Sequence, residues 1–119
     1  MPVRSYQDLE VWQRAVELAI ESYRVTRRLP SREMYGLTSQ IQRAAVSIPA
    51  NIAEGHGRAS RGDYVRHLTI ANGSLRELET HLVLVERLDY AGSTELERAR
   101  TLVTRVGQML VALLRRLRK

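Results

Sequence analysis

Apolar residues recur every three or four positions along most of this chain, which is the spacing of one face of an α-helix. Four such segments cover nearly the whole sequence, and short breaks containing glycine, proline or serine separate them. No segment alternates apolar and polar residues as a β-strand does. The pattern predicts an all-α protein with helices from Asp8 to Leu29, from Thr38 to Gly55, from just after Ser60 to Tyr90, and from Thr94 into the C-terminal RRLRK.

The first predicted helix carries one apolar stripe and one charged stripe, so we expect the apolar stripe to be buried. Pro30 ends this helix, because the residue before a proline avoids helical backbone geometry. The stripe expected to be buried consists of Leu9, Trp12, Val16, Ala19, Ile20 and Tyr23.

Two helix starts carry capping signals. Ser60 is placed to cap the third helix, with Asp63 three residues on as its capping-box partner. Gly92 is typical of the end of a helix, and Thr94 with Glu97 predicts a second capping box at the start of the fourth.

Two helix-disfavouring residues lie inside predicted helices. Pro49 removes a backbone donor, so we expect a bend in the second helix. Gly73 destabilises the third helix by about 1 kcal/mol relative to alanine. We therefore expect a neighbouring backbone to approach closely at Gly73.

Four helices with short connections predict an antiparallel up-down-up-down four-helix bundle, formed by residues 1–119 as a single domain. The chain has no cysteine, which excludes disulfides and thiolate metal sites. No apolar run approaches the ~20 residues that span a membrane, and the N-terminus lacks the apolar core of a signal peptide. We expect a cytoplasmic protein.

Two segments, 81–85 and 109–114, are apolar on all sides, whereas a bundle helix needs only one apolar stripe. The surplus apolar surface predicts that the protein associates with copies of itself.

The second helix also carries a polar stripe, which is expected to face the third helix. Residues at matching heights on these two antiparallel helices have numbers that sum to about 119, because both helices rise equally per residue. This matching pairs polar residues with one another, and we interpret the pairs as an internal hydrogen-bond ladder. We expect the Arg43–Glu77 pair to be at least half-buried. The predicted pairs are Gln40 with His81, Arg43 with Glu77, Ser47 with Ser74, Asn51 with His67, and Glu54 with Arg66.

Enzymatic and metal-binding interpretations of the same residues have less support. Glu54, His56 and His67 could supply an acid and a base, but no nucleophile accompanies them. Glu77 and His81 are spaced for one helix face, but such a pair occurs only once, whereas a di-metal bundle site needs two. We predict no catalytic residues, no metal and no cofactor.

The chain has a net charge of +6, and eighteen of its nineteen basic residues are arginine. In an up-down bundle the start of the first helix, the end of the second, the start of the third and the end of the fourth meet at one end. The cations gathered there favour a surface that binds nucleic acid phosphates. A codon bias towards arginine and the helix dipole at RRLRK are the alternative explanations. The predicted contact residues are Arg4, Arg58, Arg61, Arg66, Arg115, Arg116, Arg118 and Lys119.

The segments DLEVW, YGLTSQIQRAAVSIPANIAEG and GSLRELETHL resemble bacterial four-helix bundle proteins encoded in intervening sequences of 23S ribosomal RNA genes. The likeness covers residues 8 to about 90. It implies a ring-like homo-oligomer, a pentamer. The chain is also similar to the accessory variability determinant protein of diversity-generating retroelements, a relative that binds nucleic acid and reverse transcriptase. The resemblance supplies no catalytic residues.

The sequence therefore predicts a non-enzymatic homo-oligomer that binds RNA or DNA through a basic surface. The alternative is a structural or adaptor oligomer whose partner is another protein. A hydrolase or metal enzyme built on the polar stripe ranks last.

Overall fold

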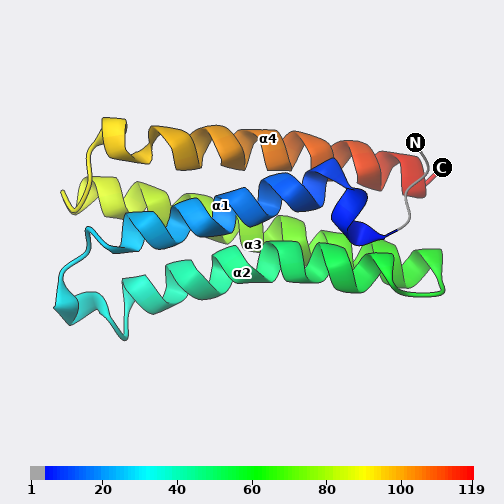
Figure 1. Ribbon diagram of the computed structural model, residues 1–119, viewed down its shortest axis with the longest axis horizontal. Coiled ribbons are helices and arrows are strands. Elements are labelled where there is room, and N and C mark those ends of the chain that lie inside the picture. The colour runs from blue at the N-terminus through cyan, green and yellow to red at the C-terminus, as the bar shows by residue number, and fades with distance from the viewer. Residues whose placement is uncertain (1–4) are drawn as a thin grey trace.

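Four long α-helices make up most of the protein, and consecutive helices run in opposite directions along its long axis (Figure 1). The computed structural model describes residues 5–119. Two 3₁₀ turns, η1 (Tyr6–Asp8) and η2 (Ser31–Glu33), precede the first two helices. The predicted all-α four-helix fold is confirmed. The helices are α1 (Glu10–Thr26), α2 (Leu37–His56), α3 (Arg61–Arg87) and α4 (Ser93–Leu117).

Each helix packs against its neighbours in the order α1, α2, α3, α4 and back to α1, around one shared apolar core. The ion pairs Glu10–Arg105 and Glu17–Arg98 join α1 to α4. The later residue of α1 pairs with the earlier residue of α4, so these two helices are antiparallel. The Cα atoms extend over 43 × 25 × 22 Å. In residues 5–119 no helix has the length and apolar character needed to cross a membrane.

Two helices are shorter than predicted. α1 begins two residues late, because the Ser5 side chain caps the separate turn η1 instead. α3 ends before Tyr90, because Asp89 has φ 62°, a left-handed conformation that cannot continue a right-handed helix. At its other end α3 has Ser60 as its N-cap, as predicted: the Ser60 hydroxyl accepts a hydrogen bond from the Asp63 N–H at 3.1 Å, which is one of the two bonds of the predicted capping box.

The cap of α4 lies two residues earlier than predicted. Thr94 and Glu97 do not form it. Gly92 is the N-cap, and Glu95 Oε1 accepts its N–H at 2.6 Å. A glutamate three residues after the cap is the usual arrangement, so the spacing rule holds but starts from the glycine.

The buried stripe of α1 differs from the predicted one. Ile20 and Tyr23 are 49% and 42% exposed, and the other predicted members are only partly buried. Two of the residues that replace them are polar: the Ser22 hydroxyl donates to the Leu18 carbonyl and the Thr26 hydroxyl to the Tyr23 carbonyl, both at 2.7 Å. These internal bonds allow hydroxyls to enter the core. The buried residues are Val11, Ala15, Leu18, Ser22, Val25 and Thr26.

The close backbone approach that we expected at Gly73 of α3 is found at a glycine of α2 instead. A Cβ at Gly73 would have no heavy atom within 4 Å, so no backbone approaches it. The close approach occurs instead at Gly55, a buried residue in the last turn of α2. A Cβ at this position would lie 2.7 Å from His67 Cβ. Pro49 lies inside α2 as predicted, and the bend expected there stays a prediction.

Candidate nucleic-acid interface and the adjoining polar network

One end of the bundle collects the start of α1, the α2–α3 connection, the start of α3 and the C-terminal end of α4 (Figure 1). Contacts between α3 and α4 show how closely these elements meet. Arg61 Nη1, at the start of α3, donates to the Lys119 carbonyl at 3.2 Å. The Arg116 charge is close enough to Tyr64 to lower the pKa of its phenol, although burial has the larger effect and raises it overall.

All predicted phosphate contacts within residues 5–119 are exposed at this end, and we refer to them as the basic end. Arg4 lies outside the described residues. Arg58 is paired with Glu54 at 2.7 Å, but no ion pair engages the rest of the set among the described residues. The basic end comprises Arg58, Arg61, Arg66, Arg115, Arg116, Arg118 and Lys119.

Arginines along the middle of the bundle are, by contrast, mostly neutralised by carboxylates. Arg100 Nη2 lies 2.6 Å from Glu86 Oε1, and hydrogen bonds from Arg100 and Ser93 hold the pKa of Glu86 below its usual value. Other ion pairs are Arg14–Glu17, Arg76–Glu79, Arg98–Glu17 and Arg105–Glu10.

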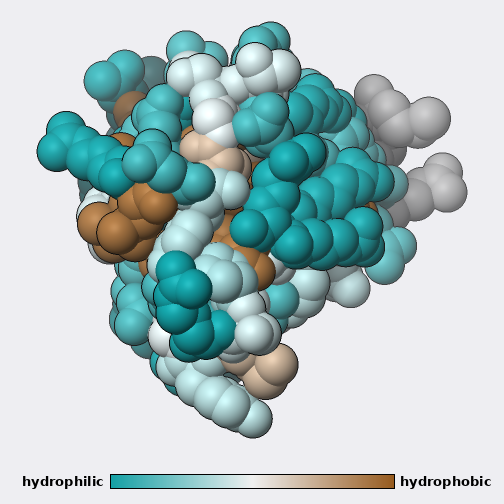
Figure 2. Space-filling view, turned by 90° about the vertical axis from the view of Figure 1, so that its left-hand side faces the viewer, coloured by the Kyte–Doolittle hydropathy of each residue, from teal (hydrophilic) through white to brown (hydrophobic). Residues whose placement is uncertain are grey.

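The opposite end of the bundle has a mixed surface (Figure 2), on which apolar side chains emerge between hydrophilic ones. Tyr35, in the α1–α2 connection, is 94% exposed. The cations Arg27 and Arg28 share a hollow with Glu21 and Glu95. Arg27 and Arg28 therefore have carboxylates beside them, whereas at the basic end Arg58 alone has an ion-pair partner among the described residues.

Aromatic residues near the basic end are used for packing. Tyr64 is half-buried and meets the His56 ring edge-on, with centroids 5.8 Å apart. Tyr6 packs edge-on against Trp12 at 5.2 Å. Neither ring forms an open platform on which a base could stack, so the geometry favours phosphate contacts over base readout.

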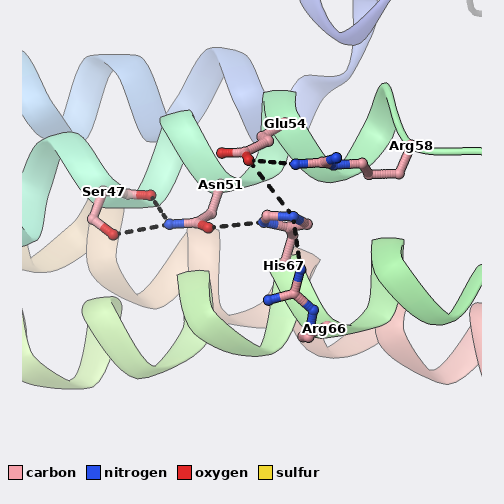
Figure 3. A network of polar contacts seen from close by, with 6 residues as sticks. All are labelled: Ser47, Asn51, Glu54, Arg58, Arg66 and His67. Atoms are coloured by element: carbon pink, nitrogen blue, oxygen red, sulfur yellow. Dashed lines mark hydrogen bonds and ion pairs between the residues drawn. The ribbon is translucent and has the colours of Figure 1, made fainter.

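A network of polar side chains connects the middle of the α2–α3 interface with the basic end (Figure 3). The Ser47 and Ser74 hydroxyls lie 2.9 Å apart. Asn51 Nδ2 donates to the Ser47 carbonyl and hydroxyl, at 2.9 and 3.0 Å. Asn51 Oδ1 lies 3.1 Å from Nδ1 of the buried His67. An amide oxygen can only accept, so His67 carries a proton on Nδ1. These are the partners that height matching predicts for Ser47 and Asn51.

The outer part of the network differs from the prediction. Glu54 does not meet Arg66: it pairs with Arg58, four residues on in the α2–α3 connection, and lies 3.8 Å from His67 Nε2. Arg66 Nη2 lies 3.5 Å from that same ring nitrogen. A cation four residues on, just past the end of the helix, is already within reach of the carboxylate, so it displaces the more distant partner on α3.

The prediction for Gln40 and His81 is wrong. Gln40 is exposed, whereas His81 is buried and neither of its ring nitrogens has a hydrogen-bond partner. His81 therefore does not belong to the network. Within the described chain, no three carboxylate or imidazole side chains lie close enough together to hold a metal ion.

The Arg43–Glu77 pair is also corrected. Both side chains line one hollow between α2 and α3, together with Ser47 and Ser74. Both are nevertheless exposed, and no ion pair joins them. The register is as predicted, but the helices leave this position open to water.

Replacement of Glu77 by alanine should consequently change the free energy of unfolding by no more than ~0.5 kcal/mol, the usual range for an exposed side chain. The buried pair expected from the sequence would give ~3–5 kcal/mol instead. Urea unfolding of wild type and Glu77→Ala, followed by circular dichroism, separates the two values. A loss above ~2 kcal/mol would contradict the exposed geometry.

Gly55 was not predicted as a site residue, and the only signal at this position is the glycine-containing break in which it lies. In the structure its missing side chain lets α3 approach α2, so that His67 reaches Asn51. The hydrogen bond from Arg61 to the Lys119 carbonyl was likewise not predicted, because no pattern in the sequence indicates it.

Comparison with known proteins gives a consistent relationship. Residues 7–112 match the profile of the family described as "23S rRNA-intervening sequence protein". The chain is similar to a crystal structure of a protein of unknown function from the S23 ribosomal protein family of Bacteroides thetaiotaomicron. The TM-score is 0.81 at 27% identity, covering 87% of this chain and 97% of that one. The search of curated proteins found no match.

Proposed function

This chain belongs to the 23S rRNA-intervening sequence protein family, and we propose that it is a non-enzymatic homo-oligomer that binds RNA or DNA through the basic end. One observation carries the proposal: the bundle gathers exposed cations at one end, where Arg58 alone has an ion-pair partner among the described residues, while most arginines along its middle are paired with carboxylates. Exposed guanidinium groups are suited to bidentate contacts with phosphate oxygens.

Recognition through the basic end is expected to depend weakly on sequence. Its cations sit on helix ends and in a connection, where long side chains reach outward to a phosphate backbone. The aromatic rings beside them are packed against other rings. In an oligomer the basic end is repeated once per subunit, so weak contacts act together along a polyanion.

A fluorescence titration across a salt series tests this function, with a labelled structured RNA and a labelled DNA duplex as probes. Each phosphate contact releases counterions, so affinity should fall steeply as salt rises. With about four to six contacts, we expect a loss of about 10²- to 10³-fold between about 50 and about 200 mM salt.

Two outcomes would contradict the proposal. If neither nucleic acid binds at low salt, the basic end is only a solvated surface, and the adaptor function with a protein partner replaces it. Binding that is insensitive to salt would show that phosphate contacts do not carry the affinity.

A further inference from the structure

The outer side of the α1–α2 pair is apolar over several turns. Gln42 Nε2, on α2, donates to Thr26 Oγ1 at the end of α1, which shows that this flank of α2 faces α1. Residues one, two and three turns further along α2 continue the flank. On α1 it is continued by residues spaced by about whole turns from Thr26, and Ile20 adjoins them one turn from both Val16 and Tyr23. The uncharged face consists of Trp12, Val16, Ala19, Ile20 and Tyr23 from α1 with Gln42, Val46, Pro49 and Ala53 from α2.

Exposure at this face is high for apolar side chains. Ile20, Tyr23 and Val46 are 49%, 42% and 46% exposed, and the other members are only partly buried. Monomeric soluble proteins rarely expose contiguous apolar patches larger than a few hundred Å². An apolar face running along two neighbouring helices therefore indicates an interaction surface.

The uncharged face is set apart by charge as well. None of its members is charged, in a chain of which 27% is Asp, Glu, Lys or Arg. The other flank of α1 carries Arg14, Glu17, Glu21 and Arg24, which pair with one another and with α4. A charged side chain on the uncharged face would lose its hydration in a contact, so its absence fits a surface that is covered.

We infer that the uncharged face is the surface through which one copy of this chain contacts another. The inference rests on the homo-oligomer of the proposed function and names where its subunits meet. A nucleic acid would find no cation there, and an acidic or basic partner would find no complementary charge. A second copy brings a surface equally free of charge.

The dimensions of the bundle suit this assignment. Its long side measures 43 Å and its width 22–25 Å. One such side can supply the ~800 Å² per partner that a standard protein interface buries. The uncharged face provides the apolar centre of such an interface, and its ring-bearing and branched side chains lose little conformational entropy on contact.

The apolar segments 81–85 and 109–114 do not offer an equivalent surface. Leu82, Val85, Leu110 and Leu114 are in the core. Val83, Leu84 and Val111 are 40%, 43% and 40% exposed. Val83 and Val111 line hollows between α3 and α4 that also contain Arg76, Glu79, Arg100 and Arg115, and Leu84 has the exposed Arg87 three residues further along α3.

The test is light scattering on a double variant, Ile20→Glu with Val46→Glu, at micromolar concentration. Both positions are half-exposed, so the new carboxylates reach water in a single bundle but would be buried in the contact. Wild type should show a multiple of 13.6 kDa, and the variant should fall to 13.6 kDa with an unchanged circular dichroism spectrum. The control Val83→Glu with Val111→Glu adds the same charge to the α3–α4 side and should keep the wild-type mass.

A milder variant, Ile20→Ser with Val46→Ser, covers the case in which the glutamates prevent folding. It should raise the concentration at which the oligomer dissociates at least tenfold. Wild-type mass in both Ile20/Val46 variants, or dissociation only in the control, would overturn the assignment, as would a monomeric wild type. An oligomeric wild type that binds no nucleic acid would overturn the proposed function and leave this inference standing.

Discussion

Reversing the charge of Arg115 and Arg116 together should weaken binding of both RNA and duplex DNA by about 100-fold at low salt, if each residue contributes about 1.4 kcal/mol. Both side chains are exposed on the last turn of α4, and no ion pair engages either of them among the described residues. Their replacement by glutamate removes two phosphate contacts and adds repulsion. The slope of log affinity against log salt should become shallower by about two. The measurement is the same fluorescence titration, repeated on the variant.

A matched control is available at the opposite end. Arg27→Glu with Arg28→Glu changes the net charge equally, and both residues are exposed beside the acids Glu21 and Glu95. Its affinity should stay within about threefold of wild type at physiological salt, where the Debye length is ~8 Å and distant charges are screened. Equal losses in the two variants would mean that net charge alone, and not the basic end, determines binding.

Replacing Gly55 by alanine should destabilise the protein by about 1–3 kcal/mol. The new methyl group would lie 2.7 Å from His67 Cβ and 3.1 Å from Tyr64 Cδ1. A Cβ cannot move without its backbone, so α2 and α3 would have to separate. Separation would also stretch the hydrogen bond between His67 and Asn51. The quantity to measure is the free energy of unfolding in urea.

Gly73→Ala provides the opposite case on α3. Gly73 is exposed, and a Cβ there would meet no atom within 4 Å. Alanine should therefore stabilise the protein by up to ~1 kcal/mol, because it favours the helix without a steric penalty. If Gly55→Ala also proved stabilising, the close crossing of α2 and α3 would be wrong.

Height matching predicted the centre of the polar network but not its edges. Equal rise on two helices determines which residues share a level, and this places Ser47 opposite Ser74 and Asn51 opposite His67. Height matching does not indicate how far each side chain lies from the axis of the bundle. Near solvent, long side chains choose among several partners, and for this reason Glu54 pairs with Arg58 in the adjoining connection.

The sequence by itself determined the four helices, their order and the gathering of cations at one end. Periodicity and breakers report local backbone preference, and short connections leave little choice of topology. Only the tertiary structure decided which stripe of α1 is buried. Hydropathy favours Ile20 and Tyr23, yet Ser22 and Thr26 enter the core because their hydroxyls bond to carbonyls of their own helix. Whether a buried hydroxyl finds such a hydrogen-bond partner depends on side-chain geometry and packing. The pattern of apolar and polar residues along a sequence does not contain this information.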